Sequence, residues 1–165
     1  MNVELTLNGE AVSWESEPHE FLTELLRRHG LIGTKRGCES GDCGACAVLL
    51  DGEEVPSCLV LAAQAHGHEV TTIEGLGSWE RPHPIQEAFV DGTAVQCGYC
   101  TPGMVIAAKA YLDRKGGGPL SEREARELLA GHVCRCTGYV KPIAAVLRAA
   151  EALGDPRSAG EEERA

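Results

Sequence analysis

The sequence has few aromatic residues, no cluster of basic residues and no long apolar run. Aromatic residues make up only 4% of its 165 residues, while 43% are hydrophobic, so a packed core consists mainly of Val, Leu, Ile and Ala. Lys and Arg form no cluster longer than a pair, and the formal net charge is −10, which argues against nucleic acid as the primary partner. Apolar runs such as 104–112 are too short to span a bilayer.

An export signal is also lacking. The N-terminus MNVELTLNGEAV has no basic region followed by an apolar stretch, and it contains no twin-arginine signal. The sequence therefore predicts a cytoplasmic protein. In that reducing compartment, its eight cysteines are better explained by metal or redox chemistry than by structural disulfides.

The first part of the chain has the pattern of strands around one helix. The pattern predicts a hairpin through Asn8-Gly9 and a second hairpin around Asp51-Gly52. Between them it predicts a helix that has Pro18 in its first turn and one apolar face made of Phe21, Leu22, Leu25 and Leu26. A short helix over 58–67 and a last strand over 68–75 are expected to follow. Strands, one helix and further strands make an α+β sheet domain, predicted over 1–76.

The second part of the chain is predicted to be helical over 77–153. A short amphipathic helix is expected over 84–90, followed by a helix over 102–115 that is almost wholly apolar and therefore buried. Ser121 and Glu124 predict the capped start of a third helix. The last helix is expected to have one apolar face made of Val140, Ile143, Ala144 and Leu147. The charged tail 154–165 is predicted to be disordered.

The cysteines fall into two sets, of which the first has a diagnostic spacing. It reads C-x4-C-x2-C-x11-C, through Cys38, Cys43, Cys46 and Cys58. Structural zinc sites usually take two widely separated C-x2-C pairs, whereas closely spaced thiolates in one loop with a fourth further on are the plant-type [2Fe–2S] arrangement. A zinc knuckle or buried free thiols are the alternatives.

Glycines in this loop suit a bulky, anionic cluster. Gly37, Gly41 and Gly44 remove side chains and allow positive φ, so that the loop can wrap closely and turn backbone N–H groups toward sulfur.

The second set is ambiguous when taken alone. It reads C-x2-C-x33-C-x-C, through Cys97, Cys100, Cys134 and Cys136. Zinc could accept two such pairs, and C-x2-C could be a redox disulfide, although no βαβ context supports a thioredoxin-like fold. Both pairs precede predicted helices, whose N-terminal N–H groups would stabilise an anionic cluster, and this placement favours a second iron–sulfur site.

Three motifs together resemble one family. KRGCESGDCGACAV, QCGYCTPGM and CRCTGY are similar to the small iron–sulfur subunit of the molybdenum hydroxylases, which include xanthine dehydrogenase, aldehyde oxidoreductase, aerobic carbon-monoxide dehydrogenase and the N-heterocycle dehydrogenases. The resemblance covers roughly residues 3–153. It implies a plant-ferredoxin-like β-grasp domain followed by a four-helix bundle, with a distal [2Fe–2S] cluster on the first cysteine set and a proximal one on the second.

The resemblance also implies partners. Gln96 and Cys136 would lie against a molybdopterin held mainly by a large subunit, and a medium subunit would bind FAD, as a dimer of heterotrimers. An amide suits a pterin edge because it offers both a donor and an acceptor. One position departs from the family, which often has Asn where His132 stands; the eight ligands are untouched, but the local hydrogen bonding is left open.

The function that follows is electron transfer, with no catalytic residue in this chain. Electrons would pass from the molybdopterin centre through the proximal and then the distal cluster to the flavin. The alternatives are a free-standing ferredoxin-like carrier and a zinc-stabilised interaction module. The large subunit contacts the substrate, so this sequence does not specify a purine, an aldehyde, carbon monoxide or an N-heterocycle.

Overall fold

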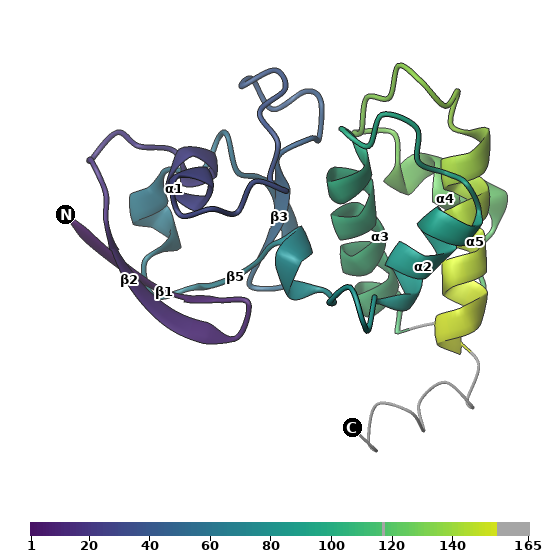
Figure 1. Ribbon diagram of the computed structural model, residues 1–165, viewed down its shortest axis with the longest axis horizontal. Helices are drawn as coiled ribbons and strands as arrows, with labels where there is room; N and C mark the ends of the chain where they lie inside the picture. Colours follow the sequence, from purple (N-terminus) through teal and green to yellow (C-terminus); the bar gives the residue numbers. More distant parts are fainter. Residues whose placement is uncertain (117, 155–165) are drawn as a thin grey trace.

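The computed structural model describes residues 1–116 and 118–154. Figure 1 shows two parts side by side, a sheet with one helix across it and a group of helices. Each part has its own core, one built around Val3, Leu25 and Val48 and the other around Phe89, Leu129 and Val146. The predicted α+β fold is confirmed, while the predicted boundary between residues 76 and 77 stays a prediction.

The sheet is mixed and has five strands in the order β2-β1-β5-β3-β4. Strands β1 (Asn2–Leu7) and β2 (Glu10–Glu15) form the predicted hairpin, in which Asn8 and Gly9 have φ of 50° and 85°. Two positive φ values are what a tight two-residue hairpin requires. Strand β1 also runs parallel to β5 (Glu69–Thr71), which places the first and last strands of this part at its centre.

Helix α1 (Leu22–Arg28) covers the sheet and buries Leu22, Leu25 and Leu26 completely. The prediction that Pro18 lies in its first turn is wrong, because the helix begins only after Phe21. The backbone of Phe21 is extended, and its N–H donates to the Glu24 carboxylate at 3.2 Å. Phe21 is 38% exposed and bridges to Leu61, so it does not share the buried face of the helix.

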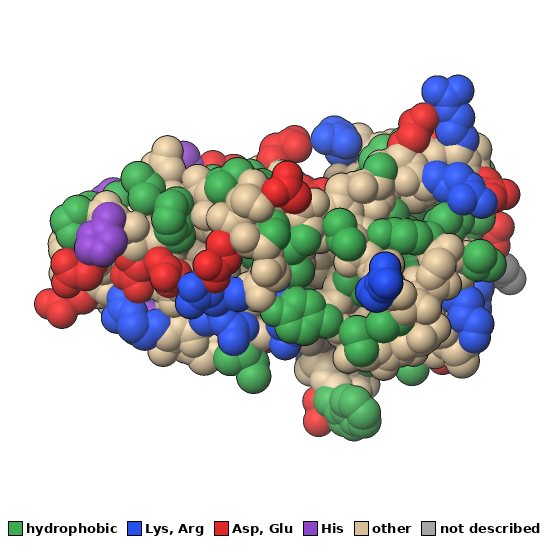
Figure 2. Space-filling model, turned by 90° about the horizontal axis from the view of Figure 1, so that it is seen from above, with side chains coloured by type: hydrophobic (Ala, Val, Ile, Leu, Met, Phe, Trp, Pro, Cys, Tyr) green, Lys and Arg blue, Asp and Glu red, His purple; other side chains and the backbone are tan. Residues whose placement is uncertain are grey.

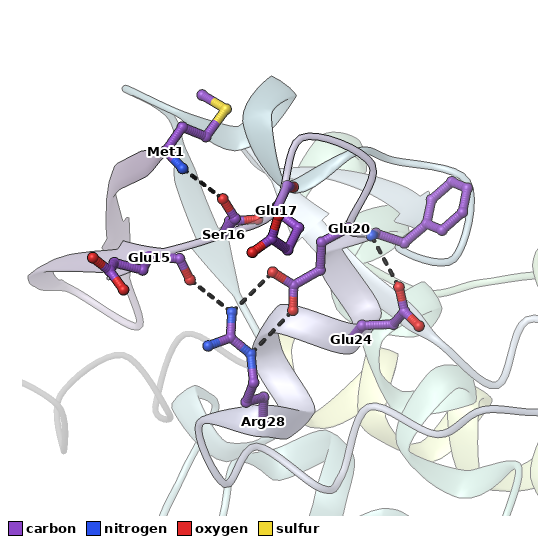
Figure 3. A network of polar contacts seen from close by, with 8 residues as sticks. Met1, Glu15, Ser16, Glu17, Glu20, Glu24 and Arg28 are labelled. Carbon is purple, nitrogen blue, oxygen red and sulfur yellow. Dashed lines mark hydrogen bonds and ion pairs between the residues drawn. The ribbon is translucent and has the colours of Figure 1, made fainter.

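A polar network ties α1 to the end of β2 (Figure 3). The Arg28 guanidinium donates to both carboxylate oxygens of Glu20, at 3.1 and 2.8 Å, and to the backbone carbonyl of Glu15 at 2.6 Å. The N-terminal ammonium of Met1 donates to the Ser16 carbonyl at 2.7 Å. A bidentate Arg–carboxylate pair fixes direction as well as distance, so the C-terminal end of α1 is anchored to the end of β2 and to the loop that follows it.

The rest of the sheet follows the predicted order with shorter elements. Strands β3 (Ala47–Leu50) and β4 (Glu53–Pro56) form the second hairpin. The helix predicted over 58–67 is only the 3-10 helix η1 (Ala62–Ala65). The strand predicted over 68–75 ends at Thr71, because the 3-10 helix η2 (Ile73–Gly75) follows it.

Four α-helices make up the second part, as predicted. They are α2 (Pro84–Asp91), α3 (Thr101–Lys115), α4 (Glu122–Leu128) and α5 (Val140–Gly154). The Ser121 hydroxyl accepts the Glu124 backbone N–H, as the predicted cap requires. The predicted face of α5 is partly wrong, since Val140 is 72% exposed and Ala144 is exposed, whereas Val146 and Ala149 are buried.

The tail predicted over 154–165 lies outside the described residues, apart from Gly154, which ends α5. Within the described ranges, no helix has both the length and the apolar character needed to cross a membrane.

Helix α3 joins the two parts, and this position explains why residues 102–108 are all apolar and mostly buried. Its Met104 and Leu112 pack into the helical core, while Ile106 and Ala110 pack on the other side against Ala47 and Leu49 of β3. A helix buried on two sides needs no polar face, so the prediction of a buried helix is confirmed.

Candidate metal centres

The first cysteine set lies on one side of the sheet, between α1 and β3, with its last member just beyond β4. Cys46 and Cys58 are 2% and 4% exposed, and Cys43 is partly buried, whereas Cys38 is exposed. The loop that carries three of them runs along the upper edge of the molecule in Figure 1. The set therefore has an inner, buried end and an outer, exposed end.

Within this set the sulfurs meet in pairs. The Cys43 thiol lies close enough to Cys38 to lower the pKa of Cys38, and the Cys46 thiol lies close enough to Cys58 to raise the pKa of Cys58. Hydrogen bonds from the Ser40 hydroxyl and backbone N–H lower the pKa of Cys38 to about 6. Burial, followed by the neighbouring Cys46, raises the pKa of Cys58 to about 11.

The glycines of this loop act in two ways. Gly41 has φ of 84°, as predicted, and its backbone interacts with Cys58 in a way that opposes the rise in the pKa of that thiol. Gly37 does not have positive φ; instead, a Cβ there would lie 2.6 Å from the Cys43 sulfur. The prediction that Gly37 supplies a positive φ is therefore wrong, and what it supplies is space beside a sulfur.

The second set is assembled from two segments of the helical part. Cys100 is the N-cap residue of α3, and Cys134 and Cys136 precede α5. The Cys136 and Cys97 sulfurs are 3.6 Å apart, and both residues are exposed. Cys100 and Cys134 are partly buried, and they lie close enough for each thiol to shift the pKa of the other. This set, too, has an inner pair and an outer pair.

The inner pair lies in contrasting surroundings. Burial, followed by the neighbouring Cys134, raises the pKa of Cys100 to about 12. Burial would also raise the pKa of Cys134, but hydrogen bonds from Thr137 and nearby backbone groups outweigh burial and lower that pKa. The Thr137 Oγ1 lies 3.1 Å from the Cys134 Sγ. Groups that stabilise a thiolate also stabilise a thiolate ligand, so this loop is suited to hold an anionic centre.

The sulfur pairing matches the ligand arrangement of a [2Fe–2S] cluster. Among residues 1–116 and 118–154, no three His, Cys, Asp or Glu side chains are placed to hold one metal ion. A zinc site needs four ligands around one point, whereas a [2Fe–2S] cluster takes two thiolates on each of two irons. Each cysteine set presents its sulfurs in that two-by-two order.

Residues that sequence reasoning missed support the second set. The Tyr139 hydroxyl accepts the Cys134 backbone N–H at 2.8 Å and donates to the His132 carbonyl at 2.9 Å. The Thr137 hydroxyl accepts the Tyr139 N–H at 3.2 Å. Both residues belong to the CRCTGY motif, so the motif pointed to them as residues near the second cysteine set. The cysteine spacing alone could not predict their hydrogen bonds.

The loops of the two sets touch each other. The Val133 N–H donates to the Cys43 carbonyl at 3.0 Å, and the Tyr99 hydroxyl donates to the Arg36 carbonyl. One contact therefore joins a residue of the first set directly to the neighbour of Cys134. Figure 2 shows the face that carries these loops, with acidic and basic side chains side by side over the sheet part and mostly hydrophobic and uncharged groups in the middle.

Gln96 lies beside the outer pair of the second set. It is exposed in the loop between α2 and α3, and its amide has no hydrogen-bond partner within the described part of the chain. An exposed, unpartnered amide next to Cys97 is free to contact another molecule.

Comparison with known domain families assigns a class to each part. Residues 5–71 match the 2Fe-2S iron-sulfur cluster binding domain, and residues 72–147 match a [2Fe-2S] binding domain. The chain is therefore a protein with two [2Fe–2S]-binding domains.

Similar proteins narrow this class further. The nicotinate dehydrogenase small FeS subunit of Eubacterium barkeri is 46% identical over 92% of this chain and 96% of its own length. The xanthine dehydrogenase iron-sulfur-binding subunit of Escherichia coli O157:H7 is 44% identical over 89% of this chain and 92% of its own. The solved aldehyde oxidoreductase of Desulfovibrio gigas superposes with a TM-score of 0.89 at 37% identity, over 96% of this chain but 18% of that longer one.

The chain belongs to the family of small [2Fe–2S] subunits of the molybdenum hydroxylases. It is an electron-transfer subunit of these oxidoreductases.

Proposed function

We propose that the eight cysteines are the cluster ligands. Each cluster would be held by one set, which consists of Cys38, Cys43, Cys46 and Cys58 for the distal cluster and Cys97, Cys100, Cys134 and Cys136 for the proximal cluster. The observation that carries this proposal is the pairing of sulfurs in each set, one pair toward the interior and one toward the surface.

We further propose the direction of electron flow. When bound, the clusters accept and release single electrons, and so carry them from molybdopterin in a large subunit to FAD in a medium subunit. This chain's own residues space the two sites through the Val133–Cys43 contact and expose one end of each set. An exposed end on each site gives one place for electrons to enter and another for them to leave.

Cluster content is the first test of the ligand assignment. The purified holoprotein should contain about four irons and about four acid-labile sulfides per chain, because two [2Fe–2S] units are proposed. Zinc without labile sulfide after anaerobic purification would overturn the assignment and favour a zinc-stabilised module.

Gln96 is proposed to contact molybdopterin, together with Cys136. Its exposure and free amide beside Cys97 support this role. In the assembled enzyme, Gln96→Ala should leave both clusters in place and lower cofactor retention or the rate at which substrate reduces the proximal cluster. Losing one buried partner would cost about 1–3 kcal/mol.

A matched control for Gln96 is available in the sheet part. Gln64→Ala removes another exposed glutamine side chain, from η1, and should change neither cofactor retention nor that rate. Rapid-freeze EPR during substrate reduction measures the rate. Full molybdopterin content and a wild-type rate in Gln96→Ala would show that this amide has no such role.

Assembly with two further subunits is proposed as a dimer of heterotrimers. In the Desulfovibrio gigas protein the corresponding region is part of one longer chain, which supports a permanent rather than a transient association. Native mass spectrometry of the purified complex should show the three chains in equal numbers, with each present twice. A chain purified without stoichiometric partners would instead be the free-standing carrier.

We propose that the large subunit, and not this chain, determines which substrate the enzyme oxidises. Small subunits of a nicotinate dehydrogenase and a xanthine dehydrogenase are 46% and 44% identical to this chain, so similarity here does not follow the substrate. None of the eight cysteines is in a disulfide, which suits a reducing compartment, for which we propose the cytoplasm.

A further inference from the structure

His132 is a buried polar side chain at the meeting point of the two parts. It is only 2% exposed. Its Nε2 lies 2.9 Å from the Glu54 Oε1 of β4, whose side chain is 34% exposed. Its Nδ1 is buried and has no hydrogen-bond partner among the described residues. The imidazole therefore reaches from the second cysteine loop to the sheet and makes a single polar contact there.

Two glycines lie close to this ring. A Cβ on Gly44 of the first loop would lie 2.3 Å from His132 Nδ1. A Cβ on Gly103 of α3 would lie 2.2 Å from the Gly44 carbonyl oxygen. The ring, the first loop and α3 are thus in direct contact, and two glycines make that contact possible.

The backbone around His132 is held to the helical part. Its N–H donates to the Leu129 carbonyl at 3.0 Å, and its own carbonyl accepts the Tyr139 hydroxyl at 2.9 Å. The next residue, Val133, donates to the Cys43 carbonyl at 3.0 Å. The backbone of residue 132 is therefore fixed on one part while its side chain is fixed on the other, directly beside the bond that joins the two cysteine loops.

We propose that His132 is a positioning residue for electron transfer between the two metal centres. Its bond to Glu54 holds the second cysteine loop against the first, keeps the Val133–Cys43 bond closed and so fixes the spacing of the centres. This inference rests on the proposed cluster ligands. The imidazole touches neither set of sulfurs and acts only through the loops.

Amide variants separate the polar contact from simple space filling. In His132→Gln the side-chain nitrogen can take the position of Nε2 and still donate to Glu54, whereas the shorter His132→Asn cannot reach it. Glu54→Ala removes the acceptor from the partly exposed side. His68→Asn is the matched control, because His68 pairs with Asp51 at 2.5 Å on the exposed surface of the sheet part.

The first measurement is hydrogen exchange in the cluster-loaded complex. Exchange at the Val133 N–H should rise on the order of tenfold in His132→Asn and Glu54→Ala, which corresponds to ~1.4 kcal/mol. It should stay at the wild-type value in His132→Gln and His68→Asn. Exchange unchanged in both of the first two variants would overturn the proposal, and Glu54→Ala keeps the test open if His132→Asn does not fold.

The second measurement is EPR of the reduced protein. The magnetic interaction between two reduced clusters falls steeply with their separation, so its splitting should weaken or broaden in His132→Asn and Glu54→Ala and return in His132→Gln. Faster exchange with an unchanged splitting would show that His132 stabilises the junction without setting the spacing. Iron and sulfide analysis of the wild-type protein keeps this result apart from the ligand assignment, since clusters missing there would contradict that assignment, and the EPR comparison uses variants that contain the wild-type amounts of iron and sulfide.

Discussion

At the residue scale, the thiols of the two cysteine sets differ widely in acidity. Ser40 lowers the pKa of Cys38 to about 6 through hydrogen bonds, whereas burial raises the pKa of Cys58 to about 11 and that of Cys100 to about 12. The thiolate is the reactive form of cysteine. At neutral pH the metal-free chain should therefore have one thiol that is largely ionised and two that are almost wholly protonated.

This difference predicts an order of alkylation. When iron and sulfide are removed anaerobically and iodoacetamide is added at pH 7, Cys38 should be modified first and Cys58 and Cys100 last, as read by peptide mass spectrometry over time. Ser40→Ala should slow the reaction of Cys38, because it removes the largest cause of the lowered pKa. Equal rates at all three positions in the wild-type chain would contradict the order.

Single residues also show what could be predicted from the sequence. The first cysteine set was predicted from its spacing, because thiolate ligands of a cluster must come from a few fixed separations, whereas the second was ambiguous by spacing and was favoured by its place before two predicted helices. The roles of Gly37 and His132 could not be found this way. One depends on a sulfur 2.6 Å from a missing Cβ, and the other on a carboxylate from a distant strand, and neither contact leaves a local pattern.

At the scale of elements, α3 belongs to the helical core on one side and forms a separate small cluster with Ala47 and Leu49 of β3 on the other. Ile106 is fully buried and faces β3 rather than the other helices. Ile106→Ala should destabilise the full chain by about 2–5 kcal/mol, because it leaves a cavity between the sheet and the helix. Ile32→Ala removes the same atoms from a side chain that is 59% exposed and should change stability by less than about 0.5 kcal/mol.

Chemical denaturation of the cluster-loaded chain under nitrogen measures both variants. We expect the midpoint of Ile106→Ala to fall clearly below that of Ile32→Ala. Equal midpoints would mean that the contact between α3 and β3 contributes nothing to stability.

Elements were predicted best where local signals agree. The Asn8-Gly9 hairpin and the Ser121–Glu124 cap were correct, since backbone chirality and side-chain hydrogen bonds decide them locally. The start of α1 and the buried face of α5 were less well predicted. In both, packing against a distant element decides the outcome, as the Phe21–Leu61 bridge and the exposed Val140 show.

At the scale of the whole molecule, the two metal centres should be separable by mutation. Cys43→Ser should damage the distal cluster and block electron delivery to the flavin, while substrate still reduces the proximal cluster. The Val133 N–H bonds the backbone carbonyl of Cys43, so this substitution leaves the junction contact in place. Cys97→Ser is the reciprocal variant and should damage only the proximal cluster.

EPR of the assembled, reduced complexes distinguishes the two variants. Each should keep one cluster signal and lose the other. If either substitution abolished both signals in a folded complex, the division of the eight cysteines into two independent sets would be wrong.

The packing of α3 on β3 also has a consequence for how the chain folds. Ala47 and Leu49 belong to the part that is synthesised first, but Ile106 and Ala110, which cover them, come much later in the sequence. Contacts between residues so far apart form slowly, and domains generally fold as units from the N-terminus during synthesis. The apolar face of β3 therefore stays uncovered from the synthesis of Leu49 until Ile106 and Ala110 have left the ribosome. During this time the nascent chain is most prone to aggregate or to need a chaperone.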